Sequence, residues 1–195
     1  MRNARQNFGV VLTGALLATG PGCSTTSETG ELPPALESQM HSAVSRVKHT
    51  RGVDRIGSLR VLSAFGSHAT VPVRDELLVS EDPTLRSNAV YVLGEIYRLE
   101  GDPAALAAVK SSMADQDRSV RLEAARALLD GGDLDGLEVL LDGLTSRARS
   151  TRVHTFLALQ RAAGGRTFGY DPDGDMKSWG GSVDGFRHYL TVAAE

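Results

Sequence analysis

Residues 115–129 read DQDRSVRLEAARALL and contain a pattern with a helical period. Counted from Arg121, a small residue, Ala124, follows after three positions and Leu128 follows after seven. Side chains at these offsets lie on one face of an α-helix. Asp117 stands four residues before Arg121, where a carboxylate can cap the free N–H groups of a first turn. The stretch therefore predicts an amphipathic helix that begins just after Asp117.

The same pattern occurs at four places along the chain. Its arginines are separated by 31, 35 and 31 residues, and a leucine follows each of them seven positions later. The arginines are Arg55, Arg86, Arg121 and Arg152, and the leucines are Leu62, Leu93, Leu128 and Leu159. Between these helices lie further apolar periodic segments near residues 73–78, 106–113 and 137–144. Because one helix pair cannot bury its apolar stripe alone, the repeat predicts an all-α fold, an α-solenoid of stacked antiparallel helix pairs.

Two of these stretches resemble the HEAT-repeat family. Residues 115–129 match its D-x-x-V-R-x-x-A-A-x-A-L pattern, and residues 81–96, EDPTLRSNAVYVLGEI, match it in part. The resemblance covers roughly residues 52–163, and the outer units depart from it, with Ala148 and Arg51 at the Asp position. It implies a HEAT-like solenoid that acts as a non-catalytic scaffold for protein–protein interaction.

The repeated residues are interpreted as structural. We expect each aspartate to cap a helix and to pair with the arginine four positions later, and we expect the leucines to fill the layer between helices. The positions assigned these roles are Asp82, Arg86, Leu93, Asp117, Arg121, Leu128, Arg152 and Leu159.

Residues 1–22 have the layout of a signal peptide. Two arginines precede an apolar run of eleven residues at 8–18, and such a run rises only about 16 Å as a helix, too short for a bilayer core of roughly 30 Å. Cys23 follows Gly22 and precedes Ser24, which resembles the lipid attachment site of a bacterial lipoprotein, although Gly20 and Pro21 depart from that pattern. The sequence predicts lipidation at Cys23 and a membrane-anchored protein of the cell envelope that faces the periplasm. Cleavage to a soluble periplasmic form and an uncleaved anchor are the alternatives.

Residues 23–35 are rich in Ser, Thr, Gly and Pro and predict a flexible tether. Helical repeats are expected over residues 36–163. The first helix, at 36–50, would cap the N-terminal end of the stack with an apolar face made by Leu36, Met40, Val44 and Val47.

Residues 164–195 contain five of the ten aromatic residues of the chain: Phe168, Tyr170, Trp179, Phe186 and Tyr189. This short irregular C-terminal element resembles the tail of some bacterial HEAT-type proteins, in which a Gly-Tyr-Asp-Pro turn precedes a short helix. It is expected to form a hydrophobic lid on the last repeat. An aromatic contact site for a partner is the alternative.

The residue pattern argues against several kinds of chemistry. The net charge is −3 and no long basic run is present, so a surface that follows nucleic acid is not expected. Asp171, Asp173 and Asp175 alternate as in a calcium loop, but Met176 and Ser182 replace the required Gly and Glu. Ser45 and Lys48 fit S-x-x-K without its companion motifs, and the five histidines lack metal-ligand spacing. We expect no catalytic residue, metal or cofactor.

Two functional hypotheses remain. The first is a scaffold that binds an unidentified protein through its inner lining, for which Arg74, Glu76, Lys110, Glu138 and Asp142 on the second helices are candidates. The second is an enzyme or enzyme accessory of the HEAT-like lyase type, which would require a cavity that unites residues 171–175 with His188.

Overall fold

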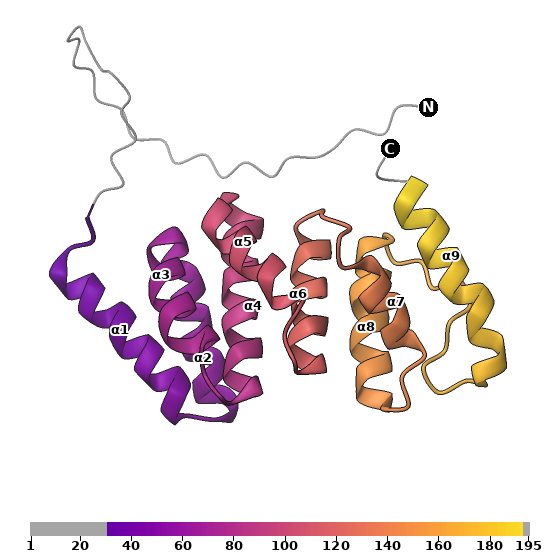
Figure 1. The fold of residues 1–195 in the computed structure, drawn as a ribbon, viewed down its shortest axis with the longest axis horizontal. Helices are drawn as coiled ribbons and strands as arrows, with labels where there is room; N and C mark the ends of the chain where they lie inside the picture. Colours follow the sequence, from indigo (N-terminus) through magenta and orange to yellow (C-terminus); the bar gives the residue numbers. More distant parts are fainter. Residues whose placement is uncertain (1–30, 193–195) are drawn as a thin grey trace, which may run out of the picture. The chain divides into compact units, whose positions relative to one another are not determined.

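The structure is a computed structural model that describes residues 31–192. The predicted signal peptide, Cys23 and most of the predicted tether lie outside these residues. Within them the chain is helical and has no strand, and the elements follow one another in the order of Figure 1. The helices are α1 (Pro34–His49), α2 (Gly52–Ala64), α3 (Thr70–Val73), α4 (Pro83–Glu100), α5 (Pro103–Ser112), α6 (Arg118–Asp130), α7 (Leu137–Leu144), α8 (Arg149–Ala162) and α9 (Trp179–Val192). A π-helical segment, Arg74–Leu78, continues α3.

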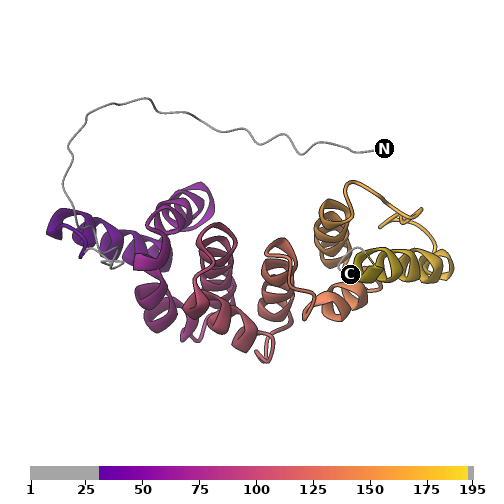
Figure 2. The ribbon, with the colours of Figure 1, turned by 90° about the horizontal axis from the view of Figure 1, so that it is seen from above.

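The helices form two rows. In the first, which we call the even row, α4 packs against α2 and α6, and α6 packs against α8. In the second, the odd row, α3 with its π-helical segment, α5 and α7 each pack against helices of the even row. Figure 2 shows α4, α6 and α8 on one side and α5 and α7 on the other. The predicted all-α solenoid of helix pairs is therefore confirmed.

Local sequence explains where the central helices begin and end. Asp82, Asp102 and Asp117 precede α4, α5 and α6, and each carboxylate accepts a hydrogen bond of 2.8 Å from the backbone N–H two residues later. Gly101 ends α4 with φ of 69°, a left-handed conformation that favours glycine. Arg51 and Ala148, which stand at the same position before α2 and α8, make no side-chain cap.

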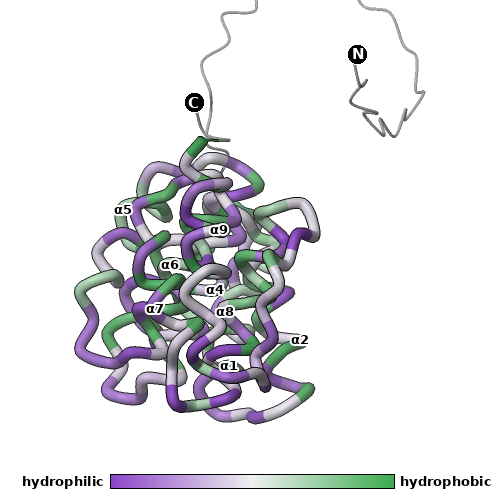
Figure 3. Tube along the Cα trace, turned by 90° about the vertical axis from the view of Figure 1, so that its right-hand side faces the viewer, coloured by the Kyte–Doolittle hydropathy of each residue, from purple (hydrophilic) through white to green (hydrophobic). Residues whose placement is uncertain are grey.

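The repeated leucines are fully buried, and each of the four lies in an even-row helix. The buried residues form two apolar clusters, not one continuous seam. Helix α6 belongs to both, because Ala124 and Leu128 lie in the first cluster and Ala125 and Leu129 lie in the second. Figure 3 shows hydrophobic and hydrophilic stretches alternating along the helices, as expected for elements that bury one face. The two halves of the stack therefore share α6.

Small residues allow α4 and α6 to approach closely. A Cβ atom built at Gly94 of α4 would lie 2.5 Å from the Cβ of Ala127 of α6. Neither backbone could give way without separating the two helices, so this contact requires glycine.

The expected pairing of each arginine with the aspartate four residues earlier is wrong. Arg86 forms a two-point ion pair with Asp115 of the next repeat, at 2.8 and 2.9 Å. Its Nη1 also donates to the carbonyl oxygens of Ser80 and Glu81, at 2.9 and 3.0 Å. Helical side chains lean toward the N-terminus, so the arginine reaches the preceding loop, while the carboxylate of Asp82 is already engaged as a cap.

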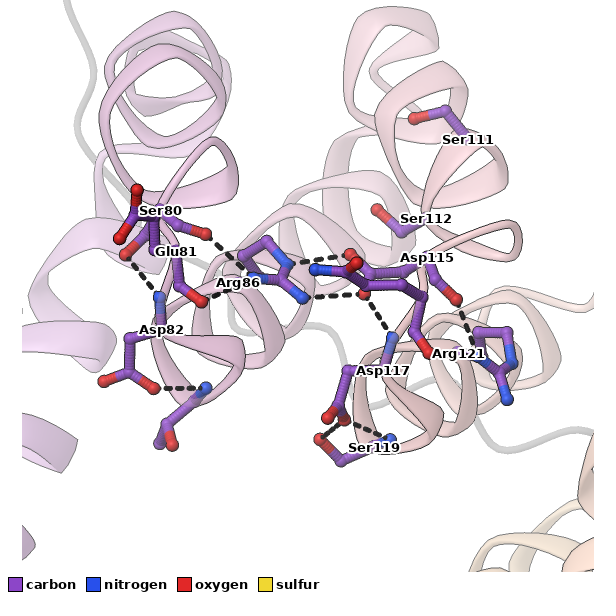
Figure 4. A network of polar contacts seen from close by, with 12 residues as sticks. Ser80, Glu81, Asp82, Arg86, Ser111, Ser112, Asp115, Asp117, Ser119 and Arg121 are labelled. Atoms are coloured by element: carbon purple, nitrogen blue, oxygen red, sulfur yellow. Dashed lines mark hydrogen bonds and ion pairs between the residues drawn. The ribbon is translucent and has the colours of Figure 1, made fainter.

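Arg121 and Arg152 contact their preceding loops in the same way (Figure 4 for Arg121). Arg121 Nη1 donates to the carbonyl oxygens of Asp115 and Gln116, at 2.6 and 2.9 Å. Arg152 donates to those of Ser146 and Arg147, at 2.8 and 3.1 Å. The repeated arginine therefore fixes the turn between helix pairs.

Helix α1 buries Met40, Val44 and Val47 as expected, but Leu36 is 42% exposed. Because α1 begins at Pro34, Leu36 lies in its first turn, one turn before the first buried residue. No helix within residues 31–192 is both long and apolar enough to cross a membrane.

The C-terminal element covers the last repeat. Tyr170, Trp179 and Phe186 are buried, and the Tyr170 hydroxyl donates to the Leu144 carbonyl of α7 at 2.5 Å. Trp179 Nε1 donates to the Asp171 carbonyl at 2.9 Å, and the indole ring lies 5.1 Å from the Arg152 guanidinium. This burial favours the lid over the aromatic contact site.

Candidate functional site

A groove of about 570 Å³ lies on the even row across α4, α6 and α8. The wall from α8 carries His154, Leu157 and Arg161, and the wall from α6 carries Glu123 and Arg126. The remaining lining residues are mainly small and hydroxylated: Thr84, Ser87, Ser119, Ser150, Thr151, Thr155 and Ala158, with Leu122 and Leu140.

A second groove of about 310 Å³ lies between α2, α4 and α6. It is lined by Ile56, Leu59, Ser87, Asn88, Tyr91 and Glu123. Because both grooves share Ser87 and Glu123, they adjoin and extend from α2 to α8. We call the residues that line the two grooves the even-row surface.

Arg126 is the centre of the charged part of this surface. It forms ion pairs with Glu123 and Asp130, and its guanidinium lies 5.5 Å from the centre of the Tyr91 ring. Asp130 also accepts an ion pair of 3.0 Å from Arg161 of α8. Burial lowers the pKa of Arg126, but the neighbouring carboxylates outweigh this effect, so the pKa is raised and the side chain stays charged. The network holds α6 and α8 in register.

Apolar side chains stand exposed beside these charges. Ile56 is 51% exposed and Leu157 is 47% exposed, and Tyr91 is half-buried between them along the row. On the wall of the smaller groove, Asn88 Nδ2 is buried and has no hydrogen-bond partner among residues 31–192. The surface thus sets apolar anchors beside paired charges, an arrangement that can hold a polypeptide.

The contact residues proposed on the second helices lie on the odd row, away from both grooves. Most of them are engaged in ion pairs: Arg74 with Asp75, Glu76 with Lys48, Lys110 with Asp133, and Glu138 with Arg187. Hydrophobic periodicity identifies the buried face of each helix, but it does not tell which row carries the grooves. The sequence did contain one indication of the charged part of the even-row surface. Glu123, Arg126 and Asp130 follow one another at offsets of three and four, which places them on one face of a helix.

Of the residues considered for chemistry, His154 lines the even-row surface, whereas residues 171–175 and His188 do not. Asp171 and Asp175 accept backbone hydrogen bonds from Asp173 and Lys177, at 2.9 and 3.0 Å, as turn caps. Asp173 pairs with Arg149 at 2.6 Å, and His188 is exposed on α9. Within the described part of the chain, no three His, Cys, Asp or Glu side chains are placed to hold a metal ion.

Comparison with known proteins identifies one family. The family model described as HEAT repeats matches residues 42–129 and, in a second overlapping placement, residues 72–160. No curated protein matches the chain.

Proposed function

Because the chain belongs to the HEAT-repeat family, we propose that it is a non-catalytic scaffold of the cell envelope whose even-row surface binds a protein partner. HEAT repeats generally mediate protein–protein interaction, and stacked repeats offer extended surfaces for it. The observation that carries the proposal is the continuity of the two grooves from α2 to α8.

The composition of the even-row surface supports this choice. Tyrosine and arginine are enriched at the centres of protein interfaces, and Tyr91 and Arg126 are in contact at the middle of the row. The carboxylates already pair with Arg126, so a partner would meet a surface whose charges are balanced and ordered. The exposed Ile56 and Leu157 would supply apolar anchors at the two ends.

We expect charge placed at both anchors to abolish partner binding. The double variant Ile56→Asp with Leu157→Asp puts a carboxylate into each groove, where an apolar contact would be lost and the charge would be desolvated. The tagged full chain is purified from its native cells, and the co-purified proteins are quantified by mass spectrometry. A specific partner should decrease at least about tenfold, as for the loss of central interface residues.

The matched control is Val71→Asp with Val79→Asp, two exposed apolar residues at 53% and 72% exposure, of which Val71 lies in α3 and Val79 directly follows the π-helical segment. It should leave the partner at its normal level. If the control removes the same proteins as the even-row variant, or if neither variant changes them, the assignment of the binding surface is wrong.

We also propose that Cys23 carries a lipid that anchors the protein to the membrane, with the residues after it as a tether. The support is in the sequence: a short apolar run precedes Cys23, and Gly22 and Ser24 flank it.

The lipid proposal is tested by Cys23→Ser. Because the hydroxyl of serine cannot take the thioether-linked lipid, the variant should move from the membrane fraction to the soluble fraction after cell breakage. Immunoblotting of the two fractions measures the change. Unchanged membrane fractionation would show that something other than a lipid on Cys23 retains the chain.

A further inference from the structure

A third pocket lies where the turn between α1 and α2 meets the start of α4. It encloses about 570 Å³ and is lined by Lys48, His49, Thr50, Arg51, Arg55, Asp82 and Thr84. Every lining residue is polar or charged, and three of the seven are Lys or Arg, against one Asp. This pocket therefore differs in kind from the even-row surface, which mixes apolar and balanced charged groups.

The cations around this pocket are unusually concentrated. Residues 46–60, RVKHTRGVDRIGSLR, hold five of the 21 Lys and Arg residues of the chain and only one of its 24 acidic residues. The whole chain has a net charge of −3, so this segment is positive against an acidic background.

Comparison between the repeats shows what Arg55 lacks. The equivalent Arg86 uses Nε, Nη1 and Nη2, and two of these bind the carboxylate of Asp115, which stands six residues before Arg121. The residue six positions before Arg86 is Ser80, so the turn before α4 has no carboxylate at the position that Asp115 occupies before α6. Arg55 donates Nε to the Thr50 carbonyl at 2.8 Å, and within residues 31–192 its Nη1 and Nη2 have no acceptor.

Helix stability accounts for only some of these cations. Lys48 lies in the last turn of α1, where the helix dipole favours positive charge, and it also pairs with Glu76 at 2.7 Å. Arg51 is the residue before the first turn of α2, where the dipole disfavours a cation. It forms no ion pair within residues 31–192, so its position calls for another explanation.

We propose that this pocket binds a phosphate group, with the Arg51 and Arg55 guanidinium groups as its principal donors. Guanidinium matches the oxygens of phosphate by paired hydrogen bonds, and Thr84 and Lys48 also line the pocket. Phosphate has more oxygen atoms than a carboxylate, so it can accept hydrogen bonds from more of the pocket's donors at once. Asp82 opposes an anion, but its carboxylate is held by the Thr84 N–H at 2.8 Å, and the cations of the pocket outnumber it.

The test is a titration of the ¹⁵N-labelled full chain with sodium phosphate at constant ionic strength, followed by amide chemical shifts. Saturable shifts are expected for the amides from Thr50 to Gly52 and for Thr84. The variant Arg51→Gln should weaken phosphate binding about tenfold, because it removes hydrogen bonds to a charged group. Its matched control is Arg60→Gln, an exposed arginine of α2 that does not line the pocket, and it should leave the affinity unchanged.

The source of the phosphate is distinguished by a second arm with vesicles. The site is assigned to a lipid headgroup if phosphatidylglycerol vesicles broaden the same amide signals and phosphatidylcholine vesicles do not. In that case Arg51→Gln should abolish the broadening. Binding of inorganic phosphate without any response to vesicles assigns it to a soluble phosphate. The proposal is overturned if phosphate and chloride give the same unsaturated shifts, if acetate binds as tightly as phosphate, or if Arg60→Gln weakens binding as much as Arg51→Gln.

Discussion

Replacement of Arg86 by alanine is expected to destabilise the protein by about 3 kcal/mol, the cost of leaving one partner of a buried ion pair alone. The side chains of Arg86 and Asp115 are only 9% and 13% exposed. The variant removes the Arg86 donors from the Asp115 carboxylate and from the Ser80 and Glu81 carbonyl groups, and it leaves the carboxylate with the backbone N–H of Asp117. The free energy of unfolding in urea, for Arg86→Ala and the native chain, measures the loss.

Arg121→Ala is the matched control. Arg121 occupies the same place in the next repeat but donates only to the carbonyl oxygens of Asp115 and Gln116. Its loss should cost less, because no carboxylate is left unpaired. Equal losses in the two variants would contradict the special role of the ion pair.

The effect of Arg86→Ala should depend on pH in a defined direction. Hydrogen bonding to Arg86 lowers the pKa of Asp115 from its ordinary value of 3.8. A carboxyl group with a lowered folded-state pKa contributes stability above its unfolded pKa and loses it as the pH falls through the folded one. The difference between the native chain and the variant should therefore be largest near neutral pH and shrink below about 3.8. A difference that does not change with pH would exclude the ion pair as its cause.

The ion pair between Arg86 and Asp115 also shows which contacts can be predicted from the sequence and which cannot. The caps at Asp82 and Asp117 follow from a residue type and the two or three positions after it, so they were predictable and are present. The partner of Arg86 is 29 residues away, and it is brought near by the stacking of one helix pair on the next. A local sequence pattern cannot indicate a partner 29 residues away. The sequence therefore predicted Asp82, the nearer carboxylate, as the partner of Arg86, and this prediction was wrong.

The location of the candidate site also depends on contacts between residues that are far apart in the sequence. Leucines seven positions after each arginine mark the buried face, and Leu62, Leu93, Leu128 and Leu159 are fully buried. The position of the grooves depends on how successive pairs are rotated against each other, and this rotation is set by contacts such as Gly94 against Ala127. The even-row surface could therefore not be derived from the period of one helix.

Helix α6 carries a signal that sequence analysis could have used. It contains two apolar doublets, Ala124 with Ala125 and Leu128 with Leu129, and adjacent residues on a helix point in directions about 100° apart. The structure places the members of each doublet in different apolar clusters. A helix that is apolar on both sides is typical of an element that joins two layers, and α6 joins the two halves of this stack.

The central claim is that the helix pairs form one stack, coupled through α6, and Leu128→Ala tests it most directly. Leu128 is fully buried in the first cluster, so its truncation should cost about 3 kcal/mol. Trp179 is the single tryptophan of the chain and lies in the second cluster, so its fluorescence reports the far half, whereas far-ultraviolet circular dichroism reports all helices.

The measurement is urea unfolding of the native chain, Leu128→Ala and the control Leu99→Ala, whose side chain is 62% exposed, with both signals recorded on each sample. A coupled stack predicts that Leu128→Ala shifts the Trp179 transition and the circular dichroism transition together, while Leu99→Ala shifts neither appreciably. A Trp179 transition that stays in place while part of the helical signal is lost earlier would show that the two clusters unfold independently, which would contradict a single stack.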